Sequence, residues 1–225
     1  MTRKTAPALA LACACALAAL TIFNGCGQKK ADTDVAPALP AVDYAYDTTD
    51  IYHLELVRDR KKKDLAFLRD DDSPISAEAR ATFTGLKYFP PMKEFIFETV
   101  LAPFAEPEEL IMATSKDKPR PMLCIGTLPF EYAGQKLQLR VYMSKDTTQE
   151  RSWFIPFMDE TTDEETYMSG RYLDLAPAAP GQPVTLDFNR AYNPYCAYND
   201  RYDCPIPPNE NRLPVAILAG EKKPH

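Results

Sequence analysis

The sequence predicts a mainly β fold: an antiparallel sandwich or small barrel with N-terminal helices and a long ordered C-terminal loop. Three observations support this prediction. Helical spacing of apolar residues is confined to the chain before Gly85, and eight segments of strand-like length and composition follow at intervals of roughly ten residues. The stretch 189–212 is so rich in Asn, Tyr and Pro that no regular element is expected there.

The N-terminus has the order of a signal peptide. A basic start at Arg3 and Lys4 precedes an apolar run over 6–23, and a small-residue site, Gly25-Cys26, follows. The last residues before Cys26 are similar to a lipobox, with Phe23 in place of the usual Leu. We therefore expect residues 1–25 to be a lipoprotein signal peptide and Cys26 to carry the lipid. Ordinary secretion, with cleavage after an Ala-x-Ala triplet, is the alternative.

The mature chain is expected to be a lipidated Cys with a flexible linker over 26–48 and a single domain over 49–222. Loss of the two cations in the signal changes the formal net charge from −6 to −8. So acidic a chain is a poor candidate for binding nucleic acid. The basic cluster 58–63 is interpreted as a solvated helix face, with contact to anionic headgroups as the alternative.

Two helices are predicted at the start of this domain. From Thr49 to Asp70, Ile and Leu residues recur at spacings of three or four around a charged middle, and Asp47 or Thr49 is expected to cap the helix. A second, short helix is expected from Ser73-Pro74, because Pro is favoured at a first helical position, and it should stop at Gly85.

The strand-like segments are β-branched and aromatic, and one of them, 136–144, alternates apolar with mostly polar residues as a half-buried strand does. A short hairpin loop at Ala133-Gly134-Gln135 joins it to the segment before it. The expected strands are 94–101, 109–114, 122–132, 136–144, 152–158, 167–175, 183–188 and 213–219. Because no helical segment separates them, we expect an antiparallel arrangement.

The region 189–212 is interpreted as a long ordered loop that packs on the sheet, since its aromatic residues distinguish it from a disordered linker. Ordered loops of this length are uncommon and are often functional. We therefore expect a pocket lined by this loop and by residues 159–171.

Several motifs in this region carry a family resemblance. They are Asp187–Asn199, Cys204–Pro208, Glu210–Ile217 and Ala219–Lys222, and upstream Phe157–Asp159, Glu165–Tyr167 and Gly170–Leu173. Together they resemble the bacterial and archaeal domain of unknown function 1684, over roughly residues 51–222. The resemblance implies a domain identity and no activity. Many relatives are similar in being exported lipoproteins, which agrees with the signal at the N-terminus.

The residue inventory excludes several kinds of catalytic centre. The chain has two His: His225 is terminal, and His53 lies in the first predicted helix. A Ser-His-Asp or Cys-His centre and a His-rich zinc site are therefore not expected. No Gly-rich phosphate cradle and no GxSxG motif occurs. We expect no cofactor and no resident metal.

Three cysteines remain after lipidation: Cys124, Cys196 and Cys204. Cys196 and Cys204 are close in sequence and, if the protein is exported, lie in an oxidising compartment, so a disulfide is expected. Free thiols and a thiolate metal site with Cys124 as the third ligand are the alternatives. Cys124 itself is expected to pack as a small hydrophobic residue.

Carboxylates are the one conventional catalytic option, because paired acids hydrolyse glycosides without His. The catalytic candidates are Asp159, Asp187 and Glu210. The ligand-binding candidates, chosen for stacking or hydrogen bonding, are Arg171, Tyr172, Asn189, Tyr192, Asn193, Tyr198, Asn211 and Arg212. A network of Arg and carboxylate side chains that fixes the long loop against the sheet would use the same residue types.

The sequence thus predicts an exported, membrane-anchored envelope lipoprotein that binds a small molecule or glycan. Two alternatives are a carboxylate-dependent hydrolase acting on an envelope glycan or small molecule, and a scaffold that binds a protein through a Tyr-rich surface. The expected partners are the membrane, through the lipid anchor, and a small ligand. We expect a monomer in the cell envelope, at the outer membrane if the cell has one.

Overall fold

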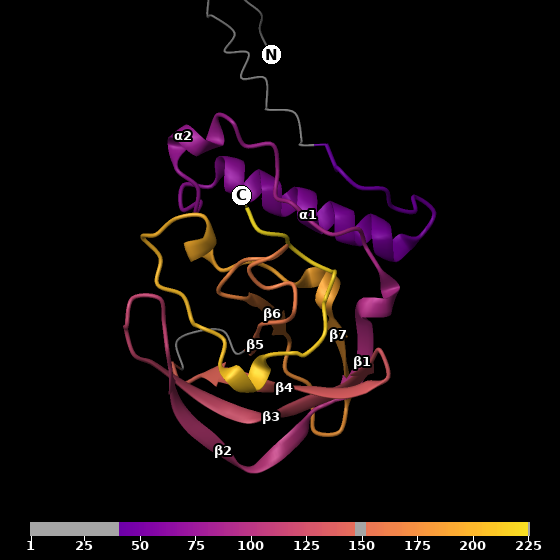
Figure 1. Ribbon diagram of the computed structural model, residues 1–225, viewed down its shortest axis with the longest axis vertical. Coiled ribbons are helices and arrows are strands. Elements are labelled where there is room, and N and C mark those ends of the chain that lie inside the picture. The colour runs from indigo at the N-terminus through magenta and orange to yellow at the C-terminus, as the bar shows by residue number, and fades with distance from the viewer. Residues whose placement is uncertain (1–40, 147–151, 225) are drawn as a thin grey trace, which may run out of the picture. The chain divides into compact units, whose positions relative to one another are not determined.

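The computed structural model describes residues 41–146 and 152–224, which form two antiparallel sheets with helices at one end (Figure 1). The mainly β prediction is confirmed, and among these residues neither sheet closes into a barrel. The predicted signal peptide and Cys26 lie outside the described residues. Within the described part, no helix combines the length and the apolar character needed to span a bilayer.

The larger sheet has the order β2-β3-β4-β5-β6. Its strands are β2 Ala102–Met112, β3 Arg120–Tyr132, β4 Gln135–Ser144, β5 Trp153–Phe157 and β6 Arg171–Leu175. β3 and β4 form the predicted hairpin, and its two turn residues, Ala133 and Gly134, have φ values of 51° and 73°. Positive φ at both positions suits the tight turns whose twist matches that of the flanking strands.

The smaller sheet pairs β1, Ile96–Val100, with β7, Pro183–Asp187. Three short 3₁₀ turns follow β7, at Phe188–Arg190, Tyr195–Ala197 and Asn209–Asn211, and a fourth, Lys93–Phe95, precedes β1. The long loop is therefore ordered, as expected.

The strand predicted over 213–219 is not formed. Its alternate residues Leu213, Val215 and Ile217 are buried, as in a strand, but the backbone pairs only locally with the chain after β5. Farther along, the guanidinium of Arg171 donates to the carbonyls of Ile217 and Ala219. A buried side chain therefore takes the place of a partner strand in satisfying this extended segment.

Helix α1, Ile51–Arg69, begins one residue after its cap Asp50, whose carboxylate accepts the N–H of Tyr52 at 3.0 Å. The second helix α2 is only Ala77–Arg80, and its cap is Ser76 rather than Ser73. Ser73 instead donates its hydroxyl to the carbonyl of Phe67 at 2.6 Å, which ties the turn to the end of α1.

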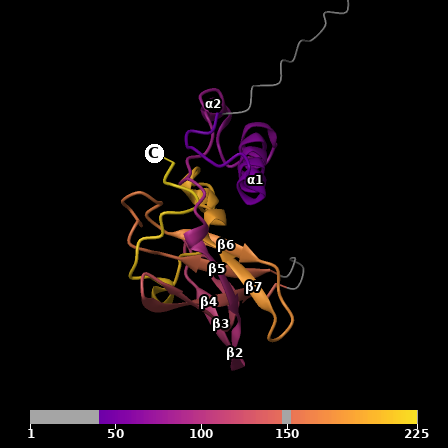
Figure 2. The same ribbon diagram turned by 90° about the vertical axis from the view of Figure 1, so that its right-hand side faces the viewer.

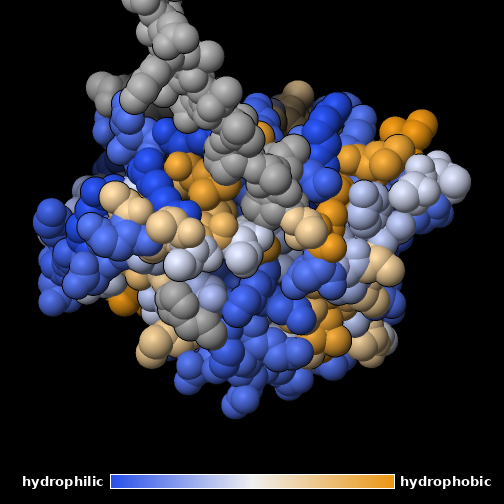
Figure 3. All heavy atoms as spheres, turned by 90° about the horizontal axis from the view of Figure 1, so that it is seen from above, coloured by the Kyte–Doolittle hydropathy of each residue, from blue (hydrophilic) through white to orange (hydrophobic). Residues whose placement is uncertain are grey.

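Figures 1 and 2 show α1 beyond the ends of the strands, across the chain that follows β7. The side that carries α1 is mainly hydrophilic, with separate small hydrophobic areas (Figure 3). Before α1, the ring of Tyr44 lies 5.1 Å from the guanidinium of Arg60. The packed chain therefore begins a few residues before the predicted boundary at Thr49, within the predicted linker.

The five-stranded sheet has two differently used faces. Along β5 and β6, Trp153, Ile155 and Leu173 enter the main hydrophobic core, which lies between the two sheets and also holds the chain over 213–219. The alternate residues Phe154 and Tyr172 point to the opposite face, as the twofold period of a strand requires. That second face carries a smaller hydrophobic cluster and is the floor of the candidate site.

Candidate functional site

The C-terminal loop crosses the second face of the sheet and is hydrogen-bonded at both sides. Tyr192 exchanges two backbone hydrogen bonds with Tyr172 on β6, at 2.9 and 3.0 Å. At the other side, the carbonyl of Cys204 accepts the N–H of Ser115, and Ile206 donates to the carbonyl of Ala113. The loop between these points is therefore held over the sheet with a space beneath it.

That space is a cavity of about 1150 Å³. The residues that line it come from α1, β3, β4, β5, β6, the chain after β2, the described residues between β4 and β5, and the loop. They are Lys63, Pro119, Arg120, Pro121, Met122, Met143, Ser144, Lys145, Asp146, Ser152, Phe154, Tyr172, Asp174, Tyr192, Pro194, Tyr195, Tyr202, Asp203, Cys204 and Pro205. Concave sites of this size, mostly apolar with a few polar groups, are typical of small-molecule binding.

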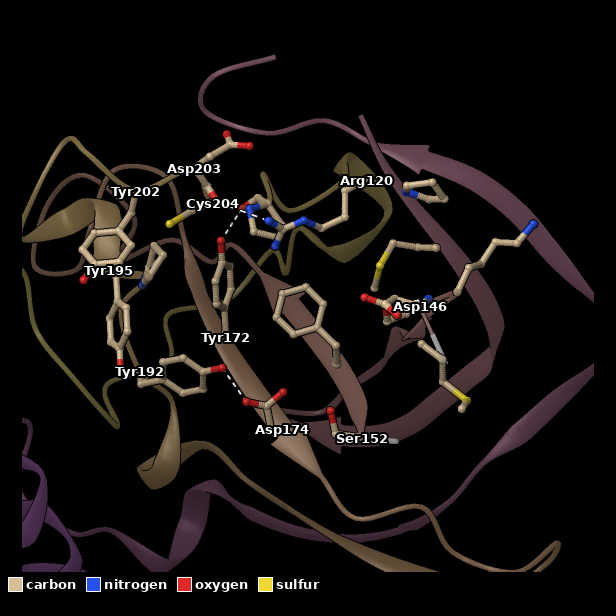
Figure 4. Close-up of a pocket in the computed structure, with 18 of the residues that line it drawn as sticks. Arg120, Asp146, Ser152, Tyr172, Asp174, Tyr192, Tyr195, Tyr202, Asp203 and Cys204 are labelled. Carbon is tan, nitrogen blue, oxygen red and sulfur yellow. Dashed lines mark hydrogen bonds between the residues drawn. The ribbon is translucent and has the colours of Figure 1, made fainter. Parts of the chain in front are cut away.

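Aromatic rings make up much of the cavity wall (Figure 4). Phe154 meets Tyr172 edge to face with ring centroids 4.8 Å apart, and Tyr172 meets Tyr192 in the same way at 5.7 Å. Tyr195 and Tyr202 form a second edge-to-face pair on the loop, with centroids 5.2 Å apart. Such pairs hold each ring in one orientation, so the wall is fixed before any ligand arrives.

One end of the aromatic floor carries Asp174, whose carboxylate accepts the hydroxyl of Tyr192. Asp174 reaches solvent, yet partial burial by its neighbours raises its pKa, and the hydrogen bond from Tyr192 opposes that shift. Burial and the adjacent Asp174 raise the pKa of Tyr192, so its hydroxyl stays protonated and keeps donating. The pair is therefore a stable polar end to the cavity.

A buried glutamate fixes the side of the cavity near α1. Glu221 is 1% exposed and pairs with Lys63, whose ammonium lies 5.0 Å from the ring centroid of Tyr192. The other carboxylate oxygen of Glu221 accepts the N–H of Asn193 at 2.8 Å and the hydroxyl of Tyr198 at 3.0 Å. Because a buried charge must be paired and hydrogen-bonded, this cluster holds the loop in one position.

The three catalytic candidates do not meet in the cavity. Asp159 is 2% exposed, and its carboxylate forms an ion pair with Arg171, at 2.8 Å between oxygen and nitrogen, and accepts the backbone N–H of Thr161. Asp187 caps the 3₁₀ turn after β7 and accepts the hydroxyl of Tyr52. Glu210 is exposed and does not line the cavity. Asp159 and Asp187 therefore serve the fold, and no residue of the stretch 159–171 lines this cavity.

Of the eight ligand-binding candidates, Tyr172 and Tyr192 line the cavity. Asn193 and Tyr198 lie behind its wall, in the cluster around Glu221. The other four hold backbone or lie at the surface: Arg171 is buried with Asp159, Asn189 bonds the backbone of Met92, Asn211 bonds the carbonyls of Arg140 and Pro156, and Arg212 is exposed beside Met158.

The disulfide expected between Cys196 and Cys204 is not formed in the structure, where both are free thiols. They are nonetheless neighbours: the N–H of Cys196 lies 3.2 Å from Sγ of Cys204. A hydrogen bond from Cys204 lowers the pKa of Cys196 to about 7, and the same contact raises that of Cys204. Cys124 is buried in the small cluster of the second face, as expected of a packing residue.

No group of three or more His, Cys, Asp or Glu side chains in the described part of the chain is positioned to hold a metal ion. The thiolate site with Cys124 as third ligand is therefore not assembled among these residues. What the cavity offers instead is aromatic surface, tyrosine hydroxyls and a few charges.

Sequence reasoning did not select Phe154, Arg120 or Asp174 as candidate site residues. For Phe154 and Asp174 a signal existed, because both alternate with core residues along their strands and must face the second side. Arg120 and Lys63 come from distant parts of the chain, and only the fold brings them to the cavity.

Comparisons with known proteins agree with this fold. The chain resembles the solution structure of an uncharacterized protein from Haloarcula marismortui, with 37% sequence identity and a TM-score of 0.61, over 77% of this chain and 95% of the other. No curated protein matches. The family model of a protein of unknown function, DUF1684, matches residues 81–222, which begin just after α2 and include every strand of the described chain and the whole C-terminal loop. The chain belongs to the DUF1684 family.

Proposed function

We propose that this protein is an exported, lipid-anchored envelope protein that binds a small molecule or glycan in the cavity beneath its C-terminal loop. The observation that carries the binding function is the cavity itself: about 1150 Å³, with a preformed aromatic wall and both acidic and basic side chains in its lining. A site of this kind binds ring-shaped ligands through their faces and orients them with a small number of polar groups.

The anchoring half of the proposal rests on the sequence. Cys26 follows a signal-like segment, and the packed chain begins near Tyr44, so only a short stretch separates the expected lipid from the domain. Lipid chains contribute about 0.8 kcal/mol per buried methylene, so multiple acylation anchors a protein stably. The Cys26→Ser variant should therefore leave the membrane fraction for the soluble fraction; a variant that stays in the membrane would contradict anchoring through this residue.

The cavity favours binding over the two alternatives. A hydrolase built on the candidate acids would need two of them facing one ligand, but Asp159 and Asp187 are engaged in the fold. A protein scaffold would present its tyrosines on an open surface, whereas Tyr172 and Tyr192 line a concave site.

Binding is tested with the mature chain and a set of neutral and acidic mono- and disaccharides, by ligand-observed NMR and calorimetry. The Tyr195→Ala variant removes a 45% exposed ring of the cavity wall and should weaken binding about threefold to tenfold, the worth of one aromatic contact. Tyr46→Ala is the matched control, since Tyr46 packs on Tyr44 and lies outside the cavity. Absence of binding at millimolar concentrations, or equal loss in both variants, would refute the proposal.

A further inference from the structure

The charges that line the cavity differ in how fully they are paired within the protein. Lys63 is paired with Glu221, and Lys145 with Glu109 at 2.8 Å. Arg120 is different. Its guanidinium donates one hydrogen bond, at 3.3 Å, to the backbone carbonyl of Asp203. It also interacts electrostatically with the Asp203 carboxylate, but among the described residues no carboxylate oxygen lies within 4.0 Å of it.

Asp174 is the complementary group. One of its oxygens accepts the hydroxyl of Tyr192, and its other oxygen has no hydrogen-bond partner among the described residues. It is not part of an ion pair within the described chain. An ionised carboxylate only accepts hydrogen bonds, so this oxygen is available to accept one from a ligand donor such as a hydroxyl.

An aromatic floor separates the two groups. Tyr172 and Asp174 lie two residues apart on the same face of β6, and Phe154 pairs in register with Asp174 on the neighbouring strand. Figure 4 shows Arg120 near the hydroxyl end of Tyr172 and Asp174 on the other side of that ring. A ring resting on this floor would therefore have a cation at one end and a hydrogen-bond acceptor at the other.

From this arrangement we infer that the cavity selects acidic sugars, a conclusion that rests on the proposed binding function and names its ligand class. The carboxylate of the sugar pairs with the guanidinium of Arg120, whose planar fork matches a carboxylate. The ring lies against half-buried Phe154, which the buried ring of Tyr172 holds in place edge to face, and ring hydroxyls donate to Asp174. The cavity is larger than a single sugar needs, so a short acidic oligosaccharide also fits within it.

The test uses the mature chain, residues 26–225 with Cys26→Ser, and two probes that differ in one group: D-glucuronate and D-glucose. Calorimetry at pH 7 should show glucuronate binding about tenfold or more tightly than glucose, because a hydrogen bond to a charged group is worth about 1.5–3 kcal/mol. Arg120→Gln should remove this preference and leave glucose affinity unchanged. Asp174→Asn should weaken both sugars.

Lys118→Gln is the matched control, since it removes an exposed cation two residues from Arg120 that does not line the cavity. It should bind glucuronate as the parent chain does. The fluorescence of Trp153, which is the single Trp and is 4% exposed, verifies that each variant is folded.

Three results would overturn the inference. Equal affinity for the two sugars, unchanged in Arg120→Gln, would leave the binding function standing but remove the acidic-sugar preference. If the chain bound L-phenylalanine and not glucuronate, Arg120 and Asp174 would instead recognise the carboxylate and the ammonium group of an amino acid. No binding of either sugar or of the other saccharides would remove the proposed function together with this inference.

Discussion

Replacing Arg171 by Met tests whether a buried ion pair fixes the C-terminal segment to the sheet. The side chains of Arg171 and Asp159 are 0% and 1% exposed, and their closest nitrogen and oxygen are 2.8 Å apart. Arg171 also donates to the carbonyls of Ile217 at 3.0 Å and Glu221 at 3.3 Å, and to that of Ala219. The variant would leave a buried carboxylate without its cation and three carbonyls without a donor.

The expected loss in the free energy of unfolding is about 3–5 kcal/mol, the cost of removing one partner of a buried pair. A typical domain is stable by only about 5–15 kcal/mol, so the loss is a large fraction of the total. Urea unfolding followed by Trp153 fluorescence measures it, because this single Trp is buried in the main core. Arg212→Met, at an exposed arginine, is the control and should change stability by no more than about 0.5 kcal/mol.

A double variant separates the pair from the other contacts of each residue. If the ion pair matters, Asp159→Asn combined with Arg171→Met should cost less than the sum of the two single changes, because the second change removes a charge that the first left unpaired. The reasoning is refuted if Arg171→Met costs under about 1 kcal/mol, the usual cost of an ordinary substitution. Strict additivity of the two changes would refute it as well.

Two further predictions concern titrating groups. Burial raises the pKa of Asp64 to about 6, above its value of about 3.9 in an unfolded chain, so the folded state binds more protons between these values and stability should fall by about 2 kcal/mol from pH 4 to pH 6. Asp64→Asn should flatten this slope in urea titrations, and an unchanged slope would contradict the assignment. In the reduced protein, alkylation of Cys196 should rise with a midpoint near pH 7, while buried Cys124 stays unmodified; mass spectrometry after iodoacetamide treatment measures both, and equal labelling of the two would count against the structure.

The alternation of apolar residues was enough to predict the β3–β4 hairpin, because successive side chains of a half-buried strand point alternately to the core and to solvent. Strand-like composition was misleading over 213–219. There Leu213, Val215 and Ile217 are buried as in a strand, but burial does not say which group will satisfy the backbone, and the guanidinium of Arg171 takes that role.

The sequence by itself determined the mainly β class, the first helix, the ordered C-terminal loop and the family, since these follow from local periodicity and from contiguous motifs. It also foresaw that an Arg and carboxylate network could fix the loop. Only the tertiary structure decided which carboxylates pair within that network and which side chains face the cavity. Arg120 and Asp174 are more than fifty positions apart in the sequence. They line the same cavity because the loop packs over the sheet, and no local sequence pattern predicts that packing.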